Sequence, residues 1–264
     1  MKRFLLLLTL FSPAFLGAQT LELGARASVG ADYKLSKGLH LTVEEELRVD
    51  NNFASLDRLQ TTVGLDYKIN DYLKVGAAYA LLNPYKPSTG AFNAPRHRVY
   101  GSVTGSVSLG DFQFSLRERL QLTHRGGTYN VYQNTPNELV LKSRLTVKYK
   151  GWKSVTPAIF GEVRNQLNDP WGEVSSTDVK YKKDGTPYYD FKFTGYTHAY
   201  VSRIRAGVNL DWKLSKAHIL TPQVMLDYVN SYVLDVNGDG TRMFSAAYEN
   251  GLRLSFCLAY TYKF

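Results

Sequence analysis

The five histidines of the sequence are the residues from which a hydrolytic site would be assembled. A lipid-modifying hydrolase needs a histidine within hydrogen-bond reach of a serine, and a carboxylate or amide that orients the imidazole. His198 and Ser202 share one face of an expected strand, but four residues of strand separate them by about 13 Å. The other histidines, which have no better partner, are His40, His97, His124 and His218. We therefore predict no catalytic residues, with the hydrolase as the alternative.

One segment has the spacing of a metal loop. Asp235-Val236-Asn237-Gly238-Asp239-Gly240 resembles the opening half of a calcium loop, with oxygen ligands at alternate positions and glycine at the sixth. The twelfth position holds Ala246, where a calcium loop has a bidentate glutamate. The same residue types also make a good turn between strands. We predict a turn here and no metal or cofactor, and calcium binding stays open.

Charged residues recur in phase along several segments of alternating polarity. The members of this lumen charge cluster are Glu44, Glu46, Arg48, Arg58, Arg117, Arg119, Arg144, Glu162, Arg164, Arg203 and Arg205. Asp66, Asp211 and Asp227 have the same phase. If the segments close into a barrel, these side chains point inward. They would then line a pore that favours anions, or they would cross-link a closed interior by charge pairs.

The alternation itself is strict and has the period of two that half-exposed strands require. In residues 21–35, apolar side chains occupy every odd position from Leu21 to Leu35. The expected strands are residues 21–35, 39–50, 57–69, 72–81, 96–109, 112–124, 138–149, 154–166, 197–214, 218–233 and 242–264. No segment has helical periodicity of comparable quality.

Short polar turns alternate with longer links between these strands. Short turns on one side and long loops on the other are typical of outer-membrane barrels, in which the short turns are periplasmic. We predict an all-β fold, a transmembrane antiparallel β-barrel of about 10–12 strands. The pattern suggests eleven strands, whereas bacterial barrels normally have an even number. We favour ten or twelve strands. The alternatives are a first segment that lies outside the barrel and a first segment that pairs in parallel.

An aromatic residue closes five of the expected strands just before a short turn or the terminus. These aromatics are Tyr33, Tyr67, Tyr149, Trp212 and Tyr262, each followed by a lysine. They would form a girdle at one membrane interface, where amphipathic rings are favoured. The chain ends on Phe264, which is similar to the C-terminal signal read by the barrel insertion machinery. Outer-membrane lipids and that machinery are the expected partners, and the oligomeric state is not determined.

Two acidic residues break the apolar face. Glu45 and Glu118 lie where lipid-facing residues are expected, each about six residues after a short turn. A lipid-facing carboxylate is costly near the bilayer centre. We expect a β-bulge to turn each one inward; the alternative is a lipid-facing or subunit-contact site.

The long segment 167–196 is rich in aromatic residues and lysine. Lys183-Asp184-Gly185-Thr186 can turn a hairpin. We expect its flanks to extend the barrel wall above the membrane, with ligand contact through the aromatics as the alternative.

The N-terminus has the features of a secretory signal. Lys2 and Arg3 precede an apolar stretch that ends in the small residues Gly17 and Ala18. We therefore expect a signal peptide at 1–18, a single barrel domain at 19–264, and a location in the bacterial outer membrane. The net charge of +9 does not indicate nucleic acid, which an exported chain rarely meets. Cys257 is the single cysteine, so an internal disulfide is excluded.

Several short motifs carry a resemblance to a known family. They are Val43-Glu44-Glu45-Glu46-Leu47-Arg48, Leu56-Asp57-Arg58-Leu59-Gln60, Asp66-Tyr67-Lys68-Ile69-Asn70, Leu73-Lys74-Val75-Gly76-Ala77, Arg96-His97-Arg98-Val99-Tyr100 and Tyr260-Thr261-Tyr262-Lys263-Phe264. The sequence resembles the family of domain of unknown function 2490, over most of the mature chain. The resemblance implies an outer-membrane barrel, mostly from Bacteroidota, with no established activity and no catalytic residues to transfer.

Overall fold

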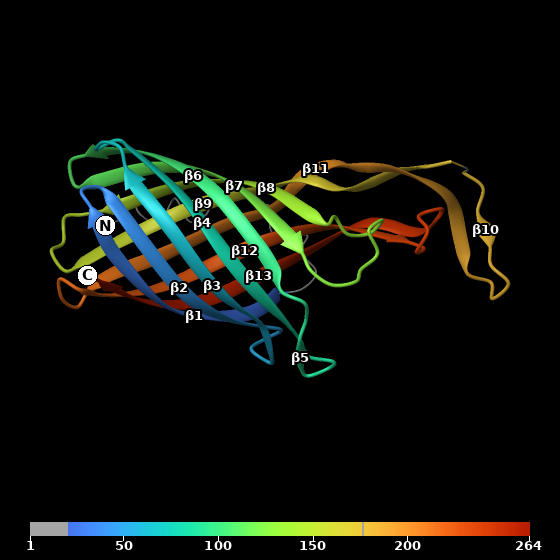
Figure 1. Cartoon of the computed structure of the whole chain (residues 1–264), viewed down its shortest axis with the longest axis horizontal. Coiled ribbons are helices and arrows are strands. Elements are labelled where there is room, and N and C mark those ends of the chain that lie inside the picture. Colours follow the sequence, from blue (N-terminus) through green and yellow to red (C-terminus); the bar gives the residue numbers. More distant parts are fainter. Residues whose placement is uncertain (1–20, 176) are drawn as a thin grey trace, which may run out of the picture.

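The computed structural model describes residues 21–175 and 177–264, and within them the chain forms a closed β-barrel (Figure 1). The expected signal peptide lies outside the described residues. The strands of the wall are β1 (Leu21–Ser36), β2 (Leu39–Asp50), β3 (Ser55–Lys68), β4 (Leu73–Lys86), β6 (Arg96–Leu109), β7 (Phe112–Arg125), β8 (Asn137–Tyr149), β9 (Val155–Val174), β11 (Pro187–Lys213), β12 (His218–Val236) and β13 (Arg242–Lys263). Two short strands, β5 (Ala91–Phe92) and β10 (Lys180–Tyr181), lie outside this ring.

Each wall strand pairs antiparallel with the next one, and β9 pairs with β11. The ring closes where β1 pairs with β13 in parallel, from Leu21 opposite Leu252 to Asp32 opposite Lys263. The predicted all-β barrel is confirmed. The preference for ten or twelve strands is wrong, because the wall between residues 21 and 264 has eleven. β1 and β13 run the same way, and a parallel ladder satisfies both edges.

The two ends of the barrel differ as the connection lengths predict. Short turns join β1 to β2, β3 to β4, β6 to β7, β8 to β9 and β11 to β12, and the C-terminus lies at the same end (Figure 1). Gly38 and Gly110 sit in two of these turns at φ values of 81° and 56°, which glycine adopts without strain. The three longest connections between wall strands, residues 87–95, 126–136 and 175–186, are all at the opposite end.

The wall is apolar outside and polar inside. Outward side chains such as Val29, Val99, Leu145, Ile159 and Val208 are exposed, although they are large and apolar. A continuous apolar outer surface of this kind is the reverse of what a water-soluble sheet protein presents. Within residues 21–175 and 177–264, no helix has the length and hydrophobicity needed to cross a membrane.

Beyond the rim at the long-loop end, β9 and β11 continue as a two-stranded arm as far as Val174 opposite Phe191. The arm ends in a hairpin turn with Gly185 at φ 82°, as the sequence predicts. A small core of Phe191, Leu234 and Val236 holds the arm to β12 and β13. The segment 167–196 therefore extends the wall, as expected.

Candidate functional site

The centre of the lumen is occupied by a network of ion pairs. Glu162 accepts a hydrogen bond from Arg144 Nε at 2.7 Å and lies 3.5 Å from Arg117 Nη2. Asp227 accepts from Arg205 Nε at 2.5 Å and from Arg205 Nη2 at 2.8 Å. Arg205 Nη1 is also 3.6 Å from Glu162, so one guanidinium joins the two carboxylates. The network therefore crosses from β8 through β9 and β11 to β12.

Acidic and basic members of this network differ in their access to solvent. The side chains of Asp227 and Glu162 are 0% and 5% exposed, whereas those of Arg117, Arg144 and Arg203 are 27%, 23% and 24% exposed. The more exposed charges of this network are therefore cationic, although the side chain of Arg205, which joins the two carboxylates, is itself only 10% exposed.

The remaining predicted lumen residues also lie inside the barrel. Arg48 pairs with Glu46 at 2.5 Å, and Arg58 with Asp57 at 2.7 Å. Arg164 pairs with Glu138 at 2.8 Å, and Arg203 lies 3.5 Å from Asp227. The guanidinium of Arg119 lies over the Tyr100 ring, 4.0 Å from its centroid. Glu44 is exposed on the same face of β2 as Glu46. All eleven members of the lumen charge cluster thus line one interior.

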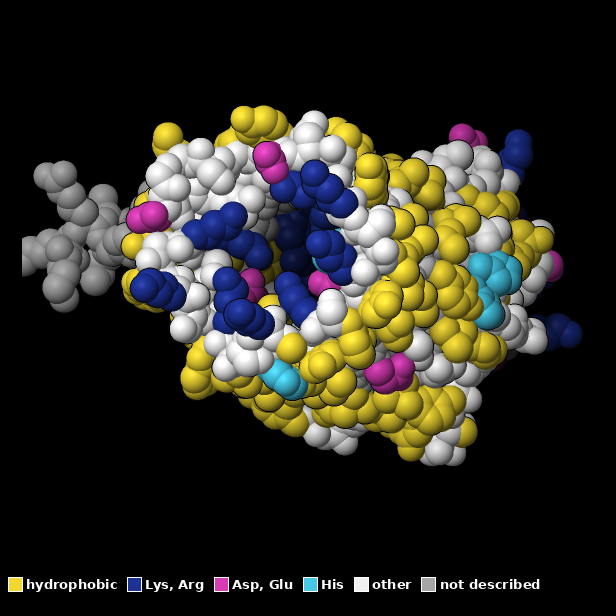
Figure 2. Space-filling model, turned by 60° about the vertical axis from the view of Figure 1, so that its left-hand side comes forward, with side chains coloured by type: hydrophobic (Ala, Val, Ile, Leu, Met, Phe, Trp, Pro, Cys, Tyr) yellow, Lys and Arg dark blue, Asp and Glu magenta, His cyan; other side chains and the backbone are white. Residues whose placement is uncertain are grey.

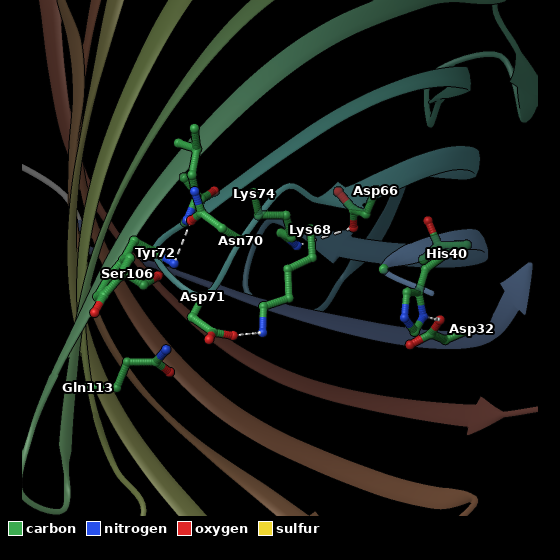
Figure 3. A pocket seen from close by; sticks show the side chains of 14 residues that line it. Asp32, His40, Asp66, Lys68, Asn70, Asp71, Tyr72, Lys74, Ser106 and Gln113 are labelled. Atoms are coloured by element: carbon green, nitrogen blue, oxygen red, sulfur yellow. Dashed lines mark hydrogen bonds and ion pairs between the residues drawn. The ribbon is translucent and has the colours of Figure 1, made fainter. Parts of the chain in front are cut away.

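At the short-turn end the lumen opens into a vestibule of about 400 Å³ (Figure 3). Its lining includes Asp32, His40, Asp66 and Lys74, and His40 Nδ1 lies 2.7 Å from Asp32 Oδ1. A second cavity of about 280 Å³ shares Lys74 with the vestibule and extends to Arg117 and Arg144. Figure 2 looks obliquely into this end, where lysine and arginine side chains surround a hollow.

Toward the long-loop end the interior is more densely filled. Leu82 and Val140 point inward and are 1% and 0% exposed. Thr123 accepts hydrogen bonds from Arg98 Nε at 3.1 Å and from Gln121 at 3.3 Å. Other lumen side chains therefore cover this part of the wall.

The aromatics of the predicted girdle lie on the outer face at the short-turn end. Tyr33, Tyr67 and Trp212 are about half exposed, at 50%, 47% and 46%. Phe112 packs on Tyr149 with ring centroids 5.2 Å apart. Phe264 packs on Tyr262 at 4.5 Å, and both aromatics belong to the same rim.

The expected bulges at Glu45 and Glu118 are absent from the described strands. Glu45 stays on the outer face and accepts a hydrogen bond from Thr61 Oγ1 at 2.6 Å. Glu118 accepts one from Ser143 Oγ at 2.6 Å. Each hydroxyl stands directly opposite its glutamate on the neighbouring strand. A cross-strand hydroxyl partner, which sequence spacing does not reveal, replaces the bulge.

His198 and Ser202, which the alternative hydrolase would use, contact different residues. His198 stacks on Trp171 with centroids 4.5 Å apart, and its Nε2 lies 2.8 Å from Tyr248 Oη. Ser202 is buried, accepts from Arg164 Nη1 at 2.8 Å and donates to the Arg164 carbonyl. These contacts do not form a nucleophile–base pair.

The oxygens of the calcium-like segment stabilise its turn. Asn237 Oδ1 accepts from the Thr241 and Arg242 backbone N–H groups at 2.9 Å each. Asp239 accepts from Thr241 Oγ1 at 2.6 Å, and Asp235 accepts from Gln133 at 3.0 Å. The segment is a turn, as predicted.

Three charged residues of the interior, Asp227, Glu138 and Lys142, are not members of the predicted lumen charge cluster. Asp227 is the main partner of Arg205, and Glu138 is the partner of Arg164. Lys142 also lies on the inner face of β8, opposite Arg119 and Arg164. Glu138 and Lys142 share the phase of Arg144, so the period of two could have placed both inside.

Comparison with known proteins supports a family assignment. No curated protein matches the sequence. Among solved structures, the NanC porin in its rhombohedral crystal form is similar, with 15% identity and a TM-score of 0.42 over 88% of this chain and 96% of that one. Residues 27–179 match the family described as protein of unknown function (DUF2490). The match spans more than half of the chain, which therefore belongs to the DUF2490 family.

Proposed function

We propose that this protein is a non-enzymatic outer-membrane β-barrel whose lumen is a narrow passage with a preference for anions. The main observation behind this proposal is that acidic and basic side chains at the centre of the lumen differ in their exposure to solvent. Asp227 and Glu162 are buried together with Arg205, which bridges them. The other arginines that face these carboxylates, Arg117, Arg144 and Arg203, stay in contact with solvent.

An ion in the lumen would meet the exposed groups first. The partly exposed side chains belong to arginines on separate strands of the wall, such as Arg48 on β2, Arg117 on β7 and Arg203 on β11. Rings of arginine or lysine select for anions in membrane pores. The buried carboxylates hold the arginines in position and contribute less to the field at the centre of the passage.

The outer wall supports the membrane location. The apolar outer face, the aromatics at the short-turn end and the longer connections at the other end are the features of outer-membrane barrels. The short turns would then face the periplasm and the β9–β11 arm would face the exterior. Purified outer membranes should contain the protein, with heat-modifiable migration on gels.

A closed structural barrel is the second candidate. It is favoured by the complete burial of Leu82 and Val140, which point into the lumen. Single-channel recordings in planar bilayers distinguish the two candidates. Discrete openings support the passage, and membranes that contain folded protein yet remain silent support the closed barrel.

A further inference from the structure

The outer wall has an apolar groove near the short-turn end, across β8, β9, β11 and β12. Its volume is about 570 Å³, and its lining includes Val147, Pro157, Ile159, Val208, Leu210 and Pro222. Pro157 stands opposite Leu210, and Pro222 stands opposite Leu258 on β13. Proline cannot donate to a strand ladder and is rare inside a sheet.

An indole ring borders the groove at the end of the barrel. Trp152 is 57% exposed and packs edge-on against Tyr149 with centroids 5.5 Å apart. Both residues line the groove. Tryptophan and tyrosine are favoured at the level of lipid headgroups, where one side of the ring is apolar and the other is wet. The groove therefore runs from the apolar face to the interface.

Three exposed lysines lie in the two turns next to this end of the groove. The β8–β9 turn carries Lys150 and Lys153, and the neighbouring β11–β12 turn carries Lys216, all exposed. The backbone N–H of Lys213 donates to the carbonyl of Ser154 at 2.8 Å, so the two turns lie side by side. Within residues 21–175 and 177–264, none of the three lysines has an acidic partner.

We propose that this groove is a binding site for an anionic phospholipid of the membrane leaflet at the short-turn end. One acyl chain lies in the groove beside Pro157 and Pro222, and the phosphate of the headgroup lies among Lys150, Lys153 and Lys216. Charge complementarity selects the anionic lipid, since the groove itself has few polar atoms to discriminate headgroups. The inference rests on the proposed membrane location and is independent of whether the lumen conducts.

Lipids with brominated acyl chains quench tryptophan and test this site directly. The chain has three tryptophans, so Trp171→Phe leaves Trp152 and Trp212, both near the groove. In reconstituted vesicles, brominated phosphatidylglycerol should quench more strongly than its mole fraction in phosphatidylcholine predicts. Lys153→Gln and Lys216→Gln should each weaken the relative binding of the anionic lipid about fivefold. Val208→Phe fills the groove and should abolish the preference.

Lys37→Gln is the matched control, because Lys37 lies in a short turn at the same end, between β1 and β2, away from the groove. It should leave quenching unchanged. Equal quenching by both lipids in the wild type, or equal effects of the Lys37 and Lys153 changes, would overturn the site. If the folded protein conducts but shows no lipid preference, only this inference fails. If the protein does not enter vesicles, the proposed function fails too.

Discussion

Arg205 and Asp227 form a bidentate ion pair inside the barrel, with Nε 2.5 Å from Oδ1 and Nη2 2.8 Å from Oδ2. The pair is almost completely buried, since Asp227 is 0% and Arg205 9% exposed. The third nitrogen of the guanidinium reaches Glu162 at 3.6 Å. A single arginine thus connects the two least exposed carboxylates of the central network.

Asp227→Ala should lower the free energy of unfolding by about 3–5 kcal/mol, because it leaves buried Arg205 without its main counter-charge. Asp66→Ala is the control: Asp66 pairs with Lys74 at 3.3 Å in the vestibule and its side chain is 36% exposed. Its loss should cost about 0–1 kcal/mol. Denaturant unfolding of the refolded variants measures both, and equal midpoints would show that the centre of the lumen is as wet as the vestibule.

Glu45→Gln should stabilise the membrane-inserted barrel by about 1–2 kcal/mol, since it removes a charge from the apolar outer face. Thr61→Val should destabilise the wild type, because Glu45 then loses its 2.6 Å hydrogen bond. In the Glu45→Gln background the same change should have a smaller effect. A double-mutant cycle of unfolding in lipid vesicles measures the coupling, and zero coupling would mean that Thr61 does not stabilise the lipid-facing carboxylate.

Phe264→Ala should reduce the amount of inserted protein severalfold in cells. Phe264 packs on Tyr33 and Tyr262, and its backbone N–H donates to the Asp32 carbonyl at 3.0 Å, at the β1–β13 closure. Tyr181→Ala is a matched control, because Tyr181 is 68% and Phe264 67% exposed, at opposite ends of the molecule. Heat-modifiable gel bands quantify insertion. Equal insertion of the two variants would contradict a role for Phe264 in assembly.

Gly240→Ala should release the loop 126–136 from the β12–β13 hairpin. Gly240 has φ 71°, and a Cβ there would lie 2.5 Å from the Tyr132 ring. Gly238→Ala is the control, since its Cβ would meet no atom within 4 Å. Chymotrypsin added to intact cells should cleave at Tyr129 or Tyr132 faster in the Gly240 variant. Cleavage only after the cells are opened would place this loop in the periplasm and reverse the proposed orientation.

The period of two was sufficient to predict most of the wall. It placed Arg144 and Glu162 inside and Tyr33 and Trp212 outside, because alternation depends only on local strand geometry. It left the parallel β1–β13 pairing as one of several alternatives, because alternation along a strand does not determine how the ring closes. It also missed that Ser143 stands opposite Glu118, since cross-strand partners depend on register.

Neither the contact of the loop 126–136 with the β12–β13 hairpin nor the apolar groove could be predicted from the sequence pattern, for a related reason. Tyr132 contacts the β12–β13 hairpin, which is more than a hundred residues away along the chain. Asn130, two residues before Tyr132, donates a hydrogen bond to the carbonyl of Val236 in this hairpin at 2.9 Å. Pro157 and Pro222 share a groove only because β11 lies between their strands. Contacts of such sequence separation have no periodic signature.

The reversal potential across a planar bilayer in a salt gradient tests the central claim most directly. A passage lined by exposed arginines should give the sign of anion selectivity. Arg117→Gln combined with Arg203→Gln should move the potential toward zero, because both exposed guanidiniums are lost. Arg242→Gln, outside the lumen on the β12–β13 hairpin, should leave it unchanged. A potential with the sign of cation selectivity, or one that the double variant does not alter, would contradict the account.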